Sequence, residues 1–135
     1  MRRLRNKASD LTAGFPTILL AEKEDAFRDL VKIIITSGGY NVLTAKDGKE
    51  AMKLFSRFHS EISLVFSDVR LPKLGGEDLL KRMRQIDPHV RVLFAGTYLN
   101  HEMESDLLRA GAMACIEKPQ GSKQILDKIQ DILSG

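Results

Sequence analysis

The chain has 135 residues, a length that fits one globular domain and leaves little room for a second. Hydrophobic residues make up 43% and charged residues 29%, which is too apolar for a disordered chain. The single cysteine, Cys115, excludes an internal disulfide and a multi-cysteine zinc site. No apolar run approaches the roughly 18 residues of a membrane span, and no signal peptide is apparent. We therefore expect a cytoplasmic protein with no membrane partner.

The net charge of +3 comes from the N-terminus. Residues 1–7 carry four basic side chains and no acidic one, and the rest of the chain has 17 basic residues against 18 acidic ones. A basic tail can contact phosphates, but a solvated leader is the commoner role, so we expect no nucleic-acid binding by this chain alone. Residues 1–14 lack hydrophobic periodicity and end in Ala13-Gly14. They are interpreted as a flexible basic lead-in to one domain over residues 15–135.

Five short apolar segments are typical of strands that are buried on both faces of a parallel sheet. The first, Thr17–Ala21, follows Pro16 and is apolar almost throughout. The other four are residues 40–44, 62–67, 90–95 and 112–116. Their starts are roughly 22 to 28 residues apart, which leaves room for one strand and one helix per unit rather than for hairpins.

The intervening segments carry apolar residues at three- and four-residue steps, as Phe27, Leu30, Val31 and Ile34 show for the first of them. Asp47 with Glu50 and Ser122 are expected caps, and another helix is expected to begin near Asn100. Gly38-Gly39, Asp87-Pro88 and Gly111 mark expected helix ends. Five strands alternating with five helices predict an open parallel sheet that is covered on both faces.

In such sheets the functional crevice lies at the carboxyl ends of the strands. Polar residues follow four of the predicted strands there: the loop 22–25, Asp68, Gly96-Thr97 and Lys118-Pro119. Any one of them alone is best read as a solvated loop residue. Together they indicate a shared polar site.

These residues resemble the receiver domains of two-component response regulators, over about residues 16–134. The resemblance rests on residues 18–22, 64–72 and 75–76, and on Lys118-Pro119 behind Ala110-Gly111-Ala112. It implies an α/β fold of the flavodoxin-like (βα)5 type, with a doubly wound, five-stranded parallel sheet in the order 2-1-3-4-5.

The resemblance also implies a chemistry. Asp68 would accept a phosphoryl group from a phosphohistidine on a sensor histidine kinase or phosphotransfer protein. Glu22, Asp68 and the backbone carbonyl of Arg70 would hold Mg²⁺, while Lys118 and the hydroxyl of Thr97 would contact phosphoryl oxygens. Enzymatic activity would be limited to Mg²⁺-dependent phosphoryl acceptance and slow autodephosphorylation.

Signalling would follow from protein contacts of the fourth helix, fifth strand and fifth helix, about residues 100–135. A downstream output domain or protein is the expected partner, and the same face would serve a homodimer. The chain would work alone or as part of a hybrid kinase or longer regulator.

One acid of the family pattern is replaced by a cation. Relatives carry two adjacent acids after the first strand, whereas this chain has Glu22-Lys23. An ammonium about 4 Å from a unit positive charge costs about 4 kcal/mol at an effective dielectric constant of 20, and a divalent ion doubles the cost. Lys23 would avoid it by pointing into solvent, or would pair with Glu22 or Asp68 and partly imitate a neutralised site.

Two further positions differ from the family pattern. Gly96 stands where a hydroxyl is usual, with Thr97 beside it, and Cys115 stands where relatives often carry an aromatic residue. We therefore predict a partly degenerate acidic pocket with weakened or lost Mg²⁺ binding. The alternatives are a pseudo-receiver that binds proteins without phosphorylation, and a small flavoprotein, against which the net acidic loop 22–25 argues.

Overall fold

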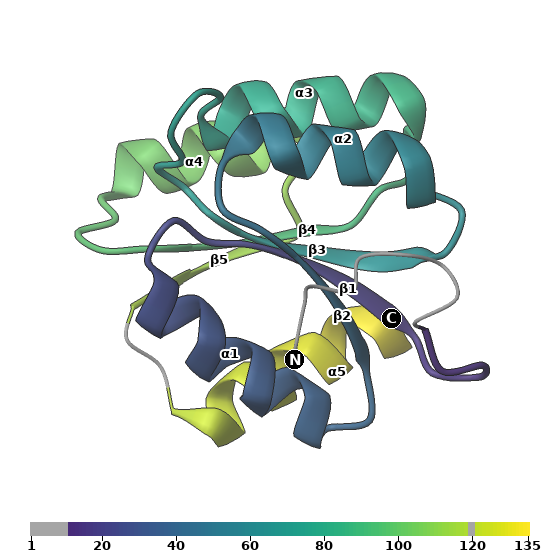
Figure 1. Ribbon diagram of the computed structural model, residues 1–135. Coiled ribbons are helices and arrows are strands. Elements are labelled where there is room, and N and C mark those ends of the chain that lie inside the picture. The colour runs from purple at the N-terminus through teal and green to yellow at the C-terminus, as the bar shows by residue number, and fades with distance from the viewer. Residues whose placement is uncertain (1–10, 119–120) are drawn as a thin grey trace.

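The computed structural model describes residues 11–118 and 121–135. Over these residues, strands and helices alternate along the chain (Figure 1). The strands are β1 (Thr17–Ala21), β2 (Asn41–Ala45), β3 (Ile62–Asp68), β4 (Val92–Gly96) and β5 (Ala114–Glu117). The helices are α1 (Asp25–Ser37), α2 (Gly48–Phe58), α3 (Gly76–Ile86), α4 (His101–Ala110) and α5 (Ser122–Ser134).

The strands form one sheet in the order β2-β1-β3-β4-β5, and every neighbouring pair is parallel. The predicted flavodoxin-like fold is thereby confirmed. Because all strands run the same way, their carboxyl ends lie along a single edge of the sheet. This edge is where α1 begins, on the left of Figure 1.

Helices cover both faces of the sheet: α2, α3 and α4 lie on one side, and α1 and α5 on the other (Figure 1). The strands supply alternate side chains to the two layers. In β1, Leu19 and Ala21 pack towards α2 and α3, whereas Ile18 and Leu20 pack towards α1 and α5. All four are at most 1% exposed. Packing on both sides fixes β1 and β3, and with them the residues that follow these strands.

The predicted capping box at Asp47 and Glu50 and the predicted start of a helix near Asn100 are confirmed. Asp47 accepts a hydrogen bond from the Glu50 amide at 2.8 Å, and the Glu50 side chain accepts one from the Lys46 amide at 2.8 Å. Asn100 likewise accepts from the Met103 amide at 2.7 Å at the start of α4. These bonds satisfy amides that have no partner inside the helix.

The prediction that Ser122 caps the last helix is wrong. Gly121 is the N-cap, and its carbonyl accepts the amide of Ile125, so Ser122 is already the first helical residue. The fifth strand also begins later than predicted, at Ala114. Ala112 does not begin the strand because its amide donates to the Leu107 carbonyl and so completes the end of α4.

The predicted lead-in lies outside the described residues for positions 1–10. Within the described part, Thr12 exchanges two backbone-to-side-chain hydrogen bonds with Asn41, each 2.9 Å long. The domain limits at residues 15–135 stay a prediction. Among the described helices, none has the length and apolar character that crossing a bilayer requires.

Candidate functional site

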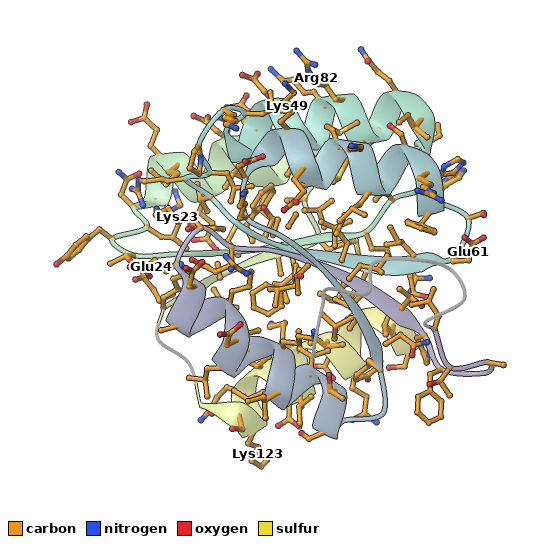
Figure 2. All side chains as sticks on the ribbon, in the orientation of Figure 1. Lys23, Glu24, Lys49, Glu61, Arg82 and Lys123 are labelled. Atoms are coloured by element: carbon orange, nitrogen blue, oxygen red, sulfur yellow. The ribbon has the colours of Figure 1, made fainter. Side chains whose placement is uncertain are left out.

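The residues predicted at the strand ends line an open cavity of about 350 Å³ at the carboxyl edge of the sheet. Its lining comprises Lys23, Glu24, Asp68, Arg70, Thr97, Tyr98 and Lys118. Figure 2 shows Lys23 and Glu24 at this edge, whereas Glu61 marks the opposite edge. A larger hollow of about 450 Å³ lies between α3 and α4, but neither Asp68 nor a lysine lines it. Asp68 and the two lysines predicted near it therefore line the smaller cavity.

Asp68 ends β3 and is 3% exposed. Its Oδ1 accepts a hydrogen bond from the Arg70 amide at 3.1 Å. Its Oδ2 lies 3.3 Å from Lys118 Nζ and 3.4 Å from Lys23 Nζ. The backbone thus holds one carboxylate oxygen in place, and the other lies between two ammonium groups.

Lys118 and Glu22 form the closest ion pair of the site. Lys118 Nζ lies 2.7 Å from Glu22 Oε1, and the other carboxylate oxygen of Glu22 accepts the Glu24 amide at 3.0 Å. Burial acts to lower the pKa of Lys118, but the hydrogen bond to Glu22 and the charges of Asp68 and Glu22 outweigh it and raise the pKa above its ordinary value. Lys118 is therefore a fixed positive charge beside Asp68.

Lys23 points into the site. Its Nζ donates to the backbone carbonyl of Arg70 at 3.0 Å and forms the ion pair with Asp68, although its side chain is 40% exposed. Of the two partners considered for Lys23, the structure places it on Asp68, while Glu22 pairs with Lys118. The Lys23 ammonium thus contacts the site while its side chain stays partly exposed to solvent.

The β4–α4 loop carries the next predicted residues. Thr97 lines the cavity, and its backbone carbonyl accepts a 2.7 Å hydrogen bond from Arg70 Nη1. Gly96 is buried, and a Cβ atom there would lie 3.0 Å from Leu99 Cδ2 and 3.1 Å from Val69 Cγ2. The space at Gly96 is therefore filled by neighbouring apolar side chains, and Thr97 is the nearest hydroxyl along the chain.

Cys115 lies in β5, is only half-buried and packs against the core cluster. Burial, with a smaller contribution from the charge of Glu104, raises the pKa of the thiol to about 11. The thiol is therefore uncharged at neutral pH, as expected for a small core residue rather than a reactive one.

Sequence reasoning missed two contributors from the first turn of α1. The ring of Phe27, interpreted as core, lies 4.7 Å from Lys118 Nζ, and Arg28 Nη1 donates to the Glu22 carbonyl at 2.9 Å. The sequence signal for both residues was their position just after β1. A helix that begins at this edge of the sheet brings its first turn close to the site.

Comparison with known proteins decides the family. The model of the response regulator receiver domain matches residues 18–130. The chain belongs to this family. As a receiver domain it is 32% identical to the sensor kinase CckA of Brucella abortus over 94% of its own length, but it spans only 13% of that kinase. It is 30% identical to the chemotaxis protein CheY of Treponema pallidum, covering 74% of this chain and 70% of CheY.

Solved structures agree on the fold. The receiver domain superposes with a TM-score of 0.84 on a chain of the CheX-CheY-BeF3-Mg+2 complex from Borrelia burgdorferi, at 26% identity, covering 88% of this chain and 90% of that one. The sequence-based identification of a receiver domain is confirmed.

Receiver domains generally bind Mg²⁺ in the acidic pocket, and Mg²⁺ needs near-octahedral oxygen ligands at about 2.0–2.1 Å. Of the groups predicted to bind it here, the Arg70 carbonyl and one carboxylate oxygen of Asp68, Oδ2, face the Lys23 ammonium. Over the described residues, no group of three or more His, Cys, Asp or Glu side chains is placed to hold a metal ion. The Lys23 ammonium therefore lies on two of the oxygens that the resemblance assigns to Mg²⁺.

Proposed function

We propose that this receiver domain accepts a phosphoryl group on Asp68 from a phosphohistidine of a sensor histidine kinase or phosphotransfer protein. The observation that carries the proposal is the placement of Asp68 Oδ2 in an open cavity between Lys23 and Lys118. A carboxylate in this position can meet an incoming donor, and the two ammonium groups offset the charge of the transferred group.

In the proposed step, Asp68 Oδ2 attacks phosphorus and a P–O bond forms. The P–N bond to the donor imidazole breaks, its electron pair stays on the ring nitrogen, and that nitrogen takes up a proton from solvent. The product is an acyl phosphate on Asp68. Lys118 would contact one phosphoryl oxygen, and the Thr97 hydroxyl would contact another after a shift of its loop. Attack of water on phosphorus would slowly return the free carboxylate.

We propose that Mg²⁺ binding is weakened or lost in this receiver domain. The support is the contact of Lys23 with both the Arg70 carbonyl and Asp68. A divalent cation at those oxygens would lie close to the Lys23 ammonium, and the repulsion would oppose its binding. Glu22, the third predicted ligand, is already engaged by Lys118 at 2.7 Å.

Output would run through the face formed by α4, β5 and α5. Leu108 of α4 is 43% exposed and Met113, just before β5, is 49% exposed, so apolar side chains are available there. The partner would be an output domain, another protein or a second copy of this chain. The length of CckA, of which this chain spans 13%, supports a role inside a longer protein.

A second candidate is a pseudo-receiver that binds proteins without phosphorylation. The observation that favours it is the complete pairing of Asp68, whose oxygens already face the Arg70 amide, Lys23 and Lys118. Such a carboxylate imitates a charge-neutralised state before any donor arrives.

Intact-protein mass spectrometry after incubation with phosphoramidate, a small phosphohistidine analogue, separates the two. Phosphoacceptance predicts a gain of one phosphoryl group in the native protein and in Asp29→Asn, an exposed control on α1. It predicts no gain in Asp68→Asn. An unmodified native protein, tested also with a phosphorylated histidine phosphotransfer domain, would instead support the pseudo-receiver.

A further inference from the structure

Lys23 occupies a position that charge and geometry mark as a cation site. Its Nζ bridges the Arg70 carbonyl at 3.0 Å and Asp68 Oδ2 at 3.4 Å. One oxygen belongs to Asp68, the last residue of β3, and the other to Arg70 in the loop that follows, whereas Lys23 follows β1. The ammonium therefore links two adjacent strand ends, as a bound cation with the same oxygens would.

The charges of the site balance without a metal ion. The carboxylates of Glu22 and Asp68 contribute two negative charges, and the ammonium groups of Lys23 and Lys118 contribute two positive ones. Each lysine has its own main partner, since Lys118 lies closest to Glu22 while Lys23 lies on the Arg70 carbonyl and Asp68. Lys23 is thus not a duplicate of Lys118.

We propose that Lys23 is the tethered cation of this receiver domain, which lets Asp68 accept a phosphoryl group without a divalent metal ion. The inference rests on the proposed phosphoacceptor function and specifies how the charge is supplied. During transfer from the imidazole to Asp68 Oδ2, Lys23 would stay on the Arg70 carbonyl and face a phosphoryl oxygen. Its position is held by a neutral carbonyl as well as by the reacting carboxylate, so it does not depend on the charge of Asp68 alone.

The first test is a Mg²⁺ titration followed by calorimetry and by the thermal midpoint. In the variant Lys23→Asp, the summed charge of the four side chains at positions 22, 23, 68 and 118 changes from zero to two negative charges. One divalent ion neutralises that charge. We expect millimolar Mg²⁺ to bind and stabilise Lys23→Asp, and to leave the native protein unchanged. Lys49→Asp, the same charge change at an exposed site on α2 away from the cavity (Figure 2), should behave like the native protein. Equal Mg²⁺ affinities of the native protein and Lys23→Asp would overturn the proposal.

The second test compares the rate of phosphorylation by phosphoramidate in EDTA and in Mg²⁺. We expect equal rates for the native protein in the two buffers. In EDTA, Lys23→Ala should be phosphorylated roughly tenfold more slowly than the native protein. Removal of a preorganised buried donor typically costs about a hundredfold or more. The smaller effect is expected because Lys23 is partly exposed and Lys118 remains. Lys49→Ala should keep the native rate.

The outcomes separate the two proposals. Phosphorylation of Asp68 that requires Mg²⁺ would overturn the role of Lys23 and leave the phosphoacceptor function standing. Absence of phosphorylation in both buffers would overturn the phosphoacceptor function, and with it the role of Lys23 in transfer. Because the Lys23 side chain is 40% exposed, its variants should fold, which thermal unfolding followed by circular dichroism would check.

Discussion

Lys118 makes its shortest contact with Glu22, at 2.7 Å between Nζ and Oε1, and lies farther from Asp68, at 3.3 Å. The side chains of Lys118 and Glu22 are 9% and 3% exposed. An ion pair so poorly hydrated is stable only while both partners are present, because a buried carboxylate without its cation keeps the full cost of desolvation.

Lys118→Met should therefore destabilise the domain as well as weaken phosphoryl acceptance. We expect a loss of about 2 kcal/mol in the free energy of unfolding, since among the described residues the Glu22 carboxylate would keep its bond from the Glu24 amide but no cation. Urea denaturation measures the change. Lys123→Met, at a side chain that is 82% exposed, is the control and should stay near the native value. Equal stabilities of the two variants would contradict the buried pair.

The cap of α2 gives a pH-dependent prediction. The hydrogen bond from the Glu50 amide holds the pKa of Asp47 below its ordinary value of 3.8, against the opposing effect of burial. Its stabilising contribution is therefore present above pH 3.8 and is lost as the pH falls through the lower, folded-state pKa. Asp47→Ala should cost about 1 kcal/mol at neutral pH. Thermal unfolding at several pH values should show the difference from the native protein shrinking in acid; a difference that grows in acid would refute the assignment.

Gly96 is the glycine of the candidate site at which we expect a side chain to cost stability. A Cβ atom there would come within 3.0 Å of Leu99 and 3.1 Å of Val69, tighter than most Cβ contacts, so those side chains would have to move slightly. We expect Gly96→Ala to destabilise by about 1 kcal/mol through overpacking. When Leu99 is already replaced by alanine, Gly96→Ala should cost less stability. The double variant is therefore compared with Leu99→Ala alone. A cost that Leu99→Ala leaves unchanged would show that some other contact is responsible.

Cys115 should react slowly with alkylating reagents. Because burial raises the pKa of its thiol to about 11, almost no thiolate is present at neutral pH. The rate of modification by iodoacetamide, followed by mass spectrometry, should rise only at strongly alkaline pH. A midpoint near the ordinary thiol value of about 8.5 would contradict the burial argument.

The sequence predicted the architecture well because its signals are local. Alternating strand and helix segments, the Asp47 cap and the Gly111 end can each be recognised within a few residues. The Ser122 cap failed because a glycine with extended backbone, Gly121, can begin a helix without a side-chain bond. Ala112 was predicted to begin the fifth strand, but its amide donates to the last turn of α4. The pattern of hydrophobic residues does not reveal such a hydrogen bond.

The sequence predicted which residues lie in the site but not which of them contact one another. The topology of a parallel sheet brings Glu22, Asp68 and Lys118 together whatever their rotamers. The direction of Lys23 depends on the carbonyl of Arg70, 47 residues away, and a long flexible side chain leaves it undetermined from sequence. In the same way, the sequence showed that Gly96 lacks a hydroxyl but not that apolar neighbours fill the space beside it.

The central claim is that Asp68 is the residue that takes the phosphoryl group. Borohydride reduces an acyl phosphate of aspartate to homoserine, so peptide mass spectrometry after phosphorylation and reduction locates the modified residue. The account predicts homoserine at position 68, formed to the same extent in EDTA and in Mg²⁺. Homoserine at another aspartate, or none after exposure to a phosphohistidine donor, would contradict it.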